Sequence, residues 1–270
     1  MAIWDDYKWS FWNPNKEPLP LKVSKHRKIS LCTTCMDRTY DLKVTLPKNL
    51  KDNMDYPNIE FVVLNYNSKD DLDDWIKKDM MPYIERGILR YFKTTEPKYY
   101  EMGHSRNVAF KVATGDVVNN IDADNYTNVN FAFALNKLAE ICQEKAVFCR
   151  CKRMMHGRFG MYKDEFLKIG GYNEQLTGYG YDDKDILYRA MALGYKMMWF
   201  TGVSGAFSER IKTPRNIVGN NMTNKNWRET ERINKEIVFN NLKNKEYISN
   251  VGKHWGKAHL LVNFKEEIDI

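Results

Sequence analysis

The chain has 270 residues and a mass of 31.9 kDa, which is enough for one sizeable hydrophobic core. Hydrophobic residues make up 43% and charged residues 29%, a composition that excludes a largely disordered chain. No apolar run is long enough for a membrane span, and the N-terminus lacks the apolar core of a signal peptide. We therefore expect a cytoplasmic protein without membrane contact, and five cysteines, an odd number, suit a reducing compartment.

Short apolar runs typical of buried strands alternate with stretches whose apolar residues recur at helical spacing. The expected strands are 28–35, 58–64, 88–92, 117–121 and 147–151. The expected helices are 38–53, with Pro47 as a kink or end, and 70–85, 101–114, 128–142, 182–193 and 227–245. This alternation predicts βαβ units, and therefore an α/β fold with a mostly parallel central sheet flanked by helices.

The chain shows no internal repeat and no low-complexity linker, so a single domain is expected. Residues 28–206 would form this domain, and residues 207–270 a helical C-terminal extension that packs on it and ends in a tail. Residues 1–27 would form an N-terminal arm whose aromatic rings pack on the domain. A stacking platform for sugars or bases is the alternative for these rings, which are Trp4, Tyr7, Trp9, Phe11 and Trp12.

The strand expected at 117–121 is followed by Asp122, Ala123 and Asp124. Alternate side chains of an extended strand point the same way, so the two carboxylates would share a side and repel each other. A divalent cation such as Mn²⁺ or Mg²⁺, particularly one that also carries a diphosphate, would relieve this repulsion. Two solvated carboxylates at a strand end are the alternative. Ligands of parallel sheets bind at the carboxyl ends of the strands, where the other expected polar residues are Thr33, Thr34, Asn65 and Asn67.

A second acidic cluster follows a glycine-rich segment. Gly-Gly-Tyr-Asn-Glu (170–174) precedes Gly-Tyr-Gly-Tyr-Asp-Asp-Lys-Asp (178–185). The three aspartates could simply cap the helix that begins there. Aromatic rings between glycines also offer flat surfaces on which sugar rings stack, with a carboxylate close enough to accept a hydroxyl proton.

In this order, the motifs resemble those of the GT-A fold nucleotide-sugar glycosyltransferases. The family-2-like branch is nearest, and the C-terminal part is similar to that of β-1,4-galactosyltransferases. Further matches are Cys-Met-Asp-Arg (35–38), Ser-Arg-Asn (105–107) and Ala-Thr-Gly-Asp (113–116). The resemblance covers roughly residues 28–200. It implies a Rossmann-like GT-A fold and metal-dependent transfer of a sugar from a nucleoside diphosphate sugar to an acceptor hydroxyl. UDP is the expected nucleotide of the donor.

Carried over by position, the resemblance assigns donor-side roles. Asp124 would bind the metal, and Asp122 the metal or the donor ribose. Arg106, with its fork of donors, would face the diphosphate, helped by His104. The nucleoside pocket would be lined by Thr33, Arg38 and Asn65, the last standing where relatives often have an aspartate that grips uracil.

On the acceptor side, Asp183 matches the general base of inverting members, and Asp182 the acid that holds the acceptor. Tyr179 and Tyr181 would contact the acceptor sugar. Relatives have a histidine metal ligand soon after this motif, where this chain has none. A histidine could supply that ligand only if the tail folds back, and the candidates there are His254 and His259.

Three alternatives remain open. A glycan or glycoside is the default acceptor, but the net charge of +7 also suits a hydroxymethylated base in DNA, since phosphate contacts give sequence-independent affinity. A lysine-rich solvated surface is the slightly favoured explanation of the charge, because the chain has no concentrated basic tract. A non-catalytic nucleotide or nucleic-acid binding module is the rival from another class. A four-thiolate zinc site is a weaker hypothesis, and its cysteines would be Cys32, Cys35, Cys149 and Cys151.

Overall fold

A computed structural model describes residues 10–12, 22–142, 145–150, 158–200, 211, 221–224 and 226–270. The strands in it are β1 (Ser10–Trp12), β2 (Ile29–Cys35), β3 (Ile59–Tyr66), β4 (Leu89–Thr94), β5 (Val117–Asn120), β6 (Ala146–Arg150), β7 (Gly160–Tyr162), β8 (Lys196–Phe200), β9 (His259–Val262) and β10 (Glu266–Asp269). The helices are α1 (Thr39–Asn53), α2 (Leu72–Trp75), the π-helical turn η2 (Ile76–Met80), α3 (Met81–Glu85), α4 (Met102–Val112), α5 (Phe131–Cys142), α6 (Lys163–Lys168), α7 (Asp182–Ala192) and α9 (Trp227–Lys243).

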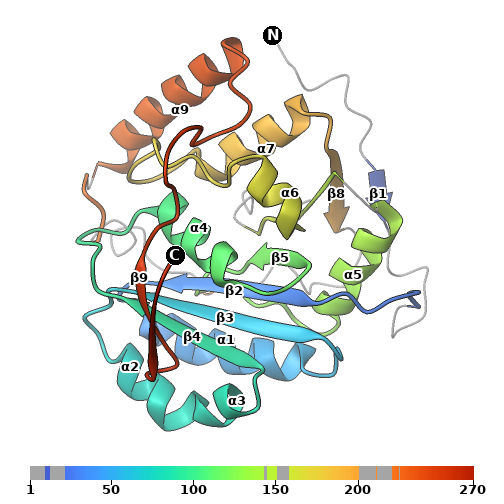
Figure 1. Cartoon of the computed structure of the whole chain (residues 1–270), viewed down its shortest axis with the longest axis vertical. Helices are drawn as coiled ribbons and strands as arrows, with labels where there is room; N and C mark the ends of the chain where they lie inside the picture. Colours follow the sequence, from blue (N-terminus) through green and yellow to red (C-terminus); the bar gives the residue numbers. More distant parts are fainter. Residues whose placement is uncertain are drawn as a thin grey trace.

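Within the described residues, the strands form one ten-stranded sheet in the order β1-β8-β6-β7-β5-β2-β3-β4-β9-β10 (Figure 1). The pairs β5–β2, β2–β3 and β3–β4 are parallel, as are β6–β8 and β1–β8. Antiparallel pairing is confined to β7 and to the β9–β10 hairpin. The predicted α/β fold with a mostly parallel central sheet is therefore confirmed. Because β2, β3, β4 and β5 run in one direction, their carboxyl ends meet at one edge of the sheet.

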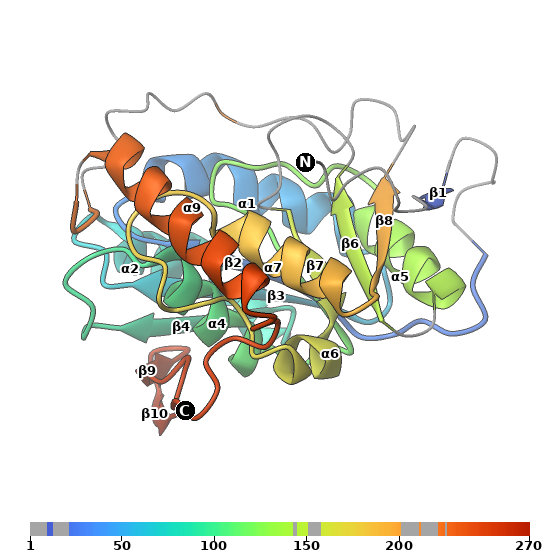
Figure 2. The ribbon, with the colours of Figure 1, turned by 90° about the horizontal axis from the view of Figure 1, so that it is seen from above.

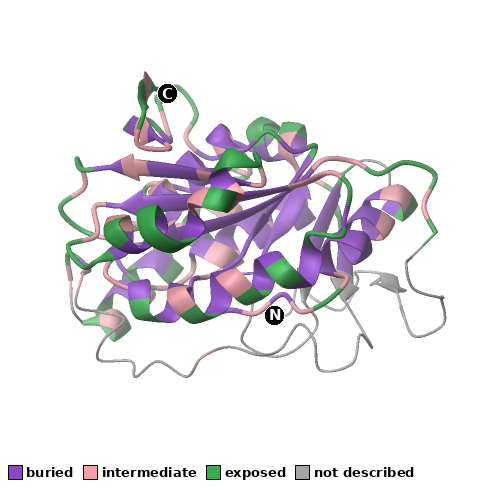
Figure 3. Ribbon diagram, turned by 90° about the horizontal axis from the view of Figure 1, so that it is seen from below, coloured by how far each residue is buried: buried purple, intermediate pink, exposed green. Residues whose placement is uncertain are grey.

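Helices cover both faces of the sheet, which explains why the central strands β2, β3 and β5 are buried along almost their whole length. On one face, α1 presents Leu42, Leu46 and Leu50 at helical spacing, and α5 joins the same core. On the other face, α4, α6 and α7 form a second core, with α9 packed over α7 (Figure 2). Figure 3 shows the resulting pattern of buried strands between helices that are buried on one side only.

Several expected elements need correction. Pro47 lies inside α1 and does not end it, because Leu46 and Leu50 are anchored in the core on either side. The single helix expected at 70–85 is interrupted by the π-helical turn at Ile76–Met80. The expected tail contains β9 and β10, and β9 pairs with β4 at the edge of the sheet.

Parts of the predicted domain division lie outside the described residues. Of the arm at 1–27, residues 1–9 and 13–21 are not described, while Ser10–Trp12 pairs as β1 with β8. The boundary at residue 206 also falls in an undescribed segment, 201–210, and stays a prediction. In the described part of the chain, no helix is both long and apolar enough to cross a membrane.

Candidate active site

The acidic motif after β5 lies at the carboxyl edge of the sheet, but not as a straight strand. The strand ends at Asn120, and the N–H of Asn125 donates to the carbonyl of Asp122 (2.9 Å), so residues 122–125 form a turn. Two residues of α1 hold this turn. Thr45 Oγ1 donates to the Ala123 carbonyl (2.6 Å), and the amide of Asn49 donates to the Asn125 carbonyl (2.9 Å).

The two acidic motifs meet at Arg106, in the first turns of α4. Its Nη2 donates to Asp122 Oδ1 (3.1 Å), and its Nη1 donates to Asp183 Oδ1 (2.8 Å) and to Asp182 Oδ2. The arginine side chain is only 6% exposed, whereas those of Asp122 and Asp183 are 40% and 22% exposed. One buried guanidinium therefore joins the turn after β5 to the start of α7, and the carboxylates of Asp122 and Asp183 remain open to solvent.

Asp124 has a different arginine partner. Its Oδ2 lies 3.5 Å from Nη2 of Arg38, whose Nε donates to Asp41 Oδ2 (2.5 Å). The amide of Asn125 donates to the other oxygen of Asp124 (2.5 Å). Asn125 in turn accepts a hydrogen bond from Nε of Arg158, which is buried (2.7 Å). The acidic turn is thus surrounded by arginines from three separate parts of the chain.

Burial and neighbouring charge shift the pKa values of these carboxyl groups in different directions. Burial alone would raise the pKa of Asp122, but the charge of Arg106 and a hydrogen bond from Asn120 bring it below its usual range. Burial, and after it the charge of Asp122, raises the pKa of Asp124. Burial also raises the pKa of Asp183 well above its usual range, against the opposing charge of Arg106. A carboxylate with a raised pKa is a better proton acceptor.

The Ser-Arg-Asn and Gly-Gly-Tyr motifs pack directly on each other. The side chain of Asn107 accepts from the N–H of Tyr172 (2.8 Å) and donates to its carbonyl (2.9 Å). Gly171 has φ +63°, and a Cβ there would lie 2.6 Å from Asn107 Oδ1, so only glycine fits. These contacts fix α4, and with it Arg106, against the segment that leads to α7.

The Gly-Tyr-Gly turn before α7 rests on α9. Thr230 Oγ1 donates to the Tyr179 carbonyl (3.1 Å), and a Cβ at Gly178 would lie 2.8 Å from Thr230 Cγ2. The ring of Tyr179, 38% exposed, contacts Trp227 edge-on at 6.3 Å between centroids. Tyr181 packs against Phe239 on the same helix. The C-terminal helix therefore positions both tyrosines that were predicted to contact the acceptor.

Other predicted donor residues are near this edge with their side chains already engaged. Asn65 is buried, donates to Asp73 (2.9 Å) and accepts from the N–H of Ser68 (2.8 Å). His104 is held through both ring nitrogens. Thr33 is buried at the carboxyl end of β2, next to Thr34, whose hydroxyl bonds that of Tyr100 (2.6 Å).

The cysteines and histidines considered as alternative metal ligands are not arranged as one site within the described residues. Cys32 and Cys35 lie in the cores on opposite faces of the sheet, so they do not form one thiolate pair. Cys151 lies outside the described residues. The tail does fold back, but His259 bonds Asp269 in the β9–β10 hairpin (2.9 Å).

The oxygen ligands of Asp122 and Asp124 suit Mn²⁺ or Mg²⁺. Within the described ranges, no group of three or more acidic, histidine or cysteine side chains is arranged to hold a metal ion. Two carboxylates are nevertheless a common protein contribution where substrate phosphates and water complete the coordination shell. A cation bound at this turn would offset the charge of Asp122, which is the second cause, after burial, of the raised pKa of Asp124. The residues present therefore fit a divalent cation that arrives with a diphosphate.

Sequence reasoning missed the residues that hold the site together. Thr45 and Asn49 looked like ordinary members of an amphipathic helix, and Asn125 like a turn residue. Arg158 lay in a glycine-rich segment without periodicity. The cluster of asparagines around the acidic pair was the available signal, because buried amides near carboxylates serve to donate hydrogen bonds.

Comparisons with known proteins bear on the fold of the chain. Residues 139–213, which include both glycine-rich motifs, match the family model described as the N-terminal domain of galactosyltransferase. No curated protein matches the chain in sequence. Among solved structures, the mannosyltransferase PcManGT from Pyrobaculum calidifontis, in complex with GDP-Man and Mn²⁺, is similar with a TM-score of 0.60 and 17% identity, over 90% of this chain and 76% of that one.

Two further structures are similar. Residues 1–349 of S. aureus TarS share 14% identity at a TM-score of 0.55, over 80% of this chain and 72% of that one. GalNAc-T7 with UDP, GalNAc and Mn²⁺ shares 15% identity at a TM-score of 0.55, over 66% of this chain and 43% of that one, so this chain spans less than half of its length. The chain therefore has the fold of the GT-A nucleotide-sugar glycosyltransferases, as the motifs predicted.

Proposed function

We propose that the protein is a metal-dependent glycosyltransferase that moves a sugar from a nucleoside diphosphate donor to a hydroxyl of a glycan or glycoside. UDP is the favoured nucleotide, and inversion at the anomeric carbon the favoured outcome. The observation that carries the proposal is the meeting of Asp122, Asp182 and Asp183 on the buried guanidinium of Arg106. The two motifs that resemble donor-binding and acceptor-binding motifs thus share one site.

Each residue of the site has a defined task in this proposal. Asp124 and Asp122 would hold Mn²⁺ or Mg²⁺, which when bound neutralises charge on the diphosphate leaving group. Arg106 would add positive charge next to that group. Asp183 would take the proton from the acceptor hydroxyl, a role that its raised pKa supports. Asp182, fixed by Arg106, would orient the acceptor.

Fewer residues of the site are assigned to the nucleotide base of the donor than to its diphosphate. In relatives an aspartate grips uracil at the position of Asn65, whose side chain here bonds Asp73 and Ser68. Thr33 and Arg38 flank the same edge, and Arg38 is partly engaged by Asp41. Recognition of UDP would therefore depend on Arg38 and on backbone groups at the ends of β2 and β3.

A thermal-shift screen of UDP-, GDP- and dTDP-sugars with and without MnCl₂ tests the donor half of the proposal. One donor should stabilise the protein only when the metal is present, and Asp124→Ala should abolish that shift. Asp183→Asn should keep the shift and lose transfer. Asp164→Asn, an exposed aspartate in the first turn of α6, is the matched control and should change neither.

Two results would refute the proposal. The first is a protein that no nucleotide sugar stabilises and that does not slowly hydrolyse any of them with manganese present, which is the behaviour of a non-catalytic module. The second is normal turnover by Asp183→Asn. Among the described residues, no observation favours a DNA acceptor over a glycan. Retention of a hydroxymethylated DNA duplex that falls steeply with added salt would reopen that alternative.

A further inference from the structure

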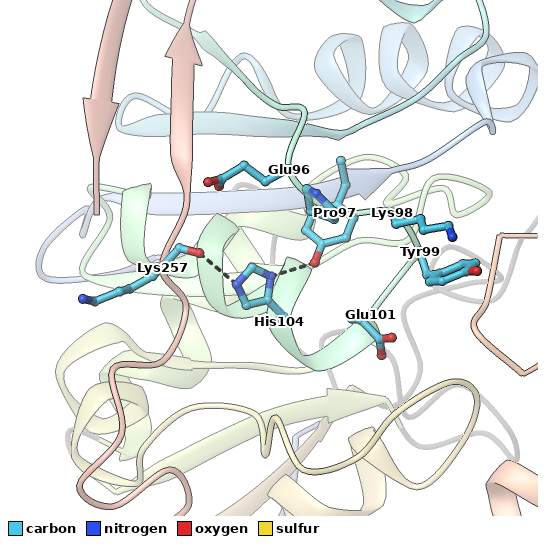
Figure 4. Close-up of a pocket in the computed structure, with 8 residues that line it drawn as sticks. Glu96, Pro97, Lys98, Tyr99, Glu101, His104 and Lys257 are labelled. Atoms are coloured by element: carbon cyan, nitrogen blue, oxygen red, sulfur yellow. Dashed lines mark hydrogen bonds between the residues drawn. The ribbon is translucent and has the colours of Figure 1, made fainter.

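A cavity of about 430 Å³ that is open to solvent lies at the segment between β4 and α4 (Figure 4). This volume is within the range of about 300–1,000 Å³ that is typical of small-molecule sites. The side chains that line it come from the end of β3, the segment before α4, the first turn of α4 and the segment before β9. They are Tyr66, Glu96, Pro97, Lys98, Tyr99, Glu101, His104 and Lys257.

The back of the cavity is rigid. The Tyr66 hydroxyl bonds Nδ1 of His104 (2.7 Å), and Nε2 of His104 donates to the Lys257 carbonyl (2.9 Å), as Figure 4 shows. Because a carbonyl can only accept, Nε2 carries a proton in this arrangement. The two bonds join β3, α4 and the C-terminal segment at one imidazole, so the wall is formed before any ligand arrives.

The mouth of the cavity combines an exposed ring with charged groups of both signs. Tyr99 is 36% exposed, and the ammonium group of Lys98 lies 5.1 Å from its ring centroid. Glu96 is anchored by a hydrogen bond from the N–H of His259 (2.9 Å). The lining residues include two acids, Glu96 and Glu101, and two lysines, Lys98 and Lys257, so the lining has no excess of either charge. This balance does not favour a polyanion or a polycation as the occupant.

A neutral ligand that both donates and accepts hydrogen bonds, and that has an apolar face for an aromatic ring, fits such a lining. A pyranose sugar has these properties: its hydroxyls match carboxylates and ammonium groups, and its C–H face matches a tyrosine ring.

The cavity is connected to the predicted acceptor turn through Glu101. One oxygen of its carboxylate accepts from the N–H of Gly178 (3.4 Å), and the other accepts from Thr223 Oγ1 (3.0 Å). Gly178 directly precedes Tyr179, on which the acceptor is predicted to stack. On the other side, the ring of Tyr66 contacts that of Tyr100 edge-on, with centroids 5.8 Å apart. The cavity therefore adjoins the acceptor side of the site by a direct contact.

We propose that this cavity binds one sugar unit of the acceptor, remote from the hydroxyl that is glycosylated. This inference rests on the proposed function and makes it more specific: the acceptor is an oligosaccharide, not a monosaccharide or a simple glycoside. Tyr99 supplies the stacking surface, while the carboxylate of Glu96 supplies a polar contact.

Binding of the fluorescently labelled full chain to immobilised saccharides tests the proposal. The array would carry chains of one to six units of glucose, galactose, mannose, N-acetylglucosamine or N-acetylgalactosamine. We expect one series in which affinity rises at least tenfold with chain length. Tyr99→Ala should reduce binding of its longer members to the level of the single sugar, and Tyr99→Phe should restore it. Ile141→Ala removes an apolar side chain of similar exposure (49%) on α5 and should bind like the unmodified protein.

The outcomes separate this inference from the proposed function. Donor hydrolysis without acceptor should be unchanged in Tyr99→Ala, because Tyr99 is not among the residues assigned to the donor and the proposal gives it to the acceptor. If saccharide binding depends on Tyr99 but the protein neither binds nor hydrolyses a nucleotide sugar, the sugar-binding cavity is supported and the proposed glycosyltransferase activity is refuted. The inference is overturned if no saccharide is retained, if Tyr99→Ala binds normally, or if Tyr99→Ala weakens binding of UDP alone, which would make the cavity a nucleotide pocket.

Discussion

Replacement of Arg189 by methionine should lower the free energy of unfolding by about 3–5 kcal/mol, the usual cost of breaking a buried ion pair. Arg189 is 1% exposed in α7, and its Nε donates to Asp185 Oδ2 (2.8 Å), which is equally buried. Its Nη atoms donate to the carbonyls of Ile169 (2.9 Å) and Gly171 (2.7 Å). The Ile169 carbonyl also accepts from the N–H of Ser249 (3.2 Å), and the Gly171 carbonyl lies 3.0 Å from the Ser249 hydroxyl, so both have another donor within reach in the variant. The expected loss therefore arises mainly from the carboxylate of Asp185, which is left in the core without a cation.

Urea unfolding followed by circular dichroism measures this loss. Arg232→Met is the matched control, because Arg232 and Glu236 form the same i,i+4 pair on α9 with both side chains more than 60% exposed. Such a pair contributes only about 0.3–0.5 kcal/mol. The double variant Asp185→Leu with Arg189→Met should recover most of the loss, since an apolar pair of similar volume replaces the ionic one.

The loss should also depend on pH. Burial already raises the pKa of Asp185, and removal of Arg189 raises it further. The folded variant then prefers the protonated carboxyl, so its deficit should shrink below the ordinary pKa of aspartate and grow as the pH rises through the raised value. A deficit under about 1 kcal/mol at neutral pH, or an equal deficit in Arg232→Met, would refute this account of the core.

Three further predictions concern the scaffold. Gly170→Ala should destabilise the protein by well over the roughly 1 kcal/mol expected for the control Gly194→Ala. Both glycines have positive φ, but only a Cβ at Gly170 would meet a backbone atom, the carbonyl oxygen of Ser249 at 2.0 Å. The melting temperatures of the two variants measure the difference. Glu60→Gln should make the free energy of unfolding less dependent on pH in the acid range. Burial would raise the pKa of Glu60, but hydrogen bonds lower it below its ordinary value. The stability that Glu60 contributes is therefore present above the ordinary glutamate pKa and is lost as the pH falls through the lowered pKa. Asn107→Ala should cost about 1–3 kcal/mol in urea unfolding and also slow donor hydrolysis, because its amide fixes α4 against the Gly-Gly-Tyr turn; unchanged hydrolysis would mean that this contact does not position Arg106.

Local pattern was sufficient for the central part of the fold. Strands β2 to β5 and the helices between them follow from apolar runs and helical spacing, because both faces of a parallel sheet must be covered. The same pattern, through the topology it implies, predicts Asp122 at the carboxyl edge of the sheet, where it lies. Asp183 lies near Asp122, since both carboxylates contact Arg106.

The remaining features depend on contacts between distant segments. The strand His259–Val262 is too short to be distinguished from a loop, and it is defined by its pairing with the open edge of β4. Asn65 matched a donor-binding position, but its hydrogen bonds go to Asp73 and Ser68, eight and three residues away. The sequence pattern shows which polar residues lie at an edge of the sheet. It does not show which neighbouring groups will form hydrogen bonds with them.

Arg106 illustrates this limit at the centre of the site. The resemblance assigned it to a diphosphate, while the structure pairs it with Asp122, Asp182 and Asp183. Both roles follow from one property, since a guanidinium has several donors in a fixed fork and serves any group of clustered oxyanions. Three carboxylates need a buried cation in order to lie side by side, and Arg106 is that cation. A diphosphate bound near Asp122 would compete with the three carboxylates for the N–H donors of Arg106. A divalent cation bound with the diphosphate would then neutralise the carboxylate charge that Arg106 no longer balances fully. The residue that holds the acidic motifs together is therefore also the one best placed to respond to the donor.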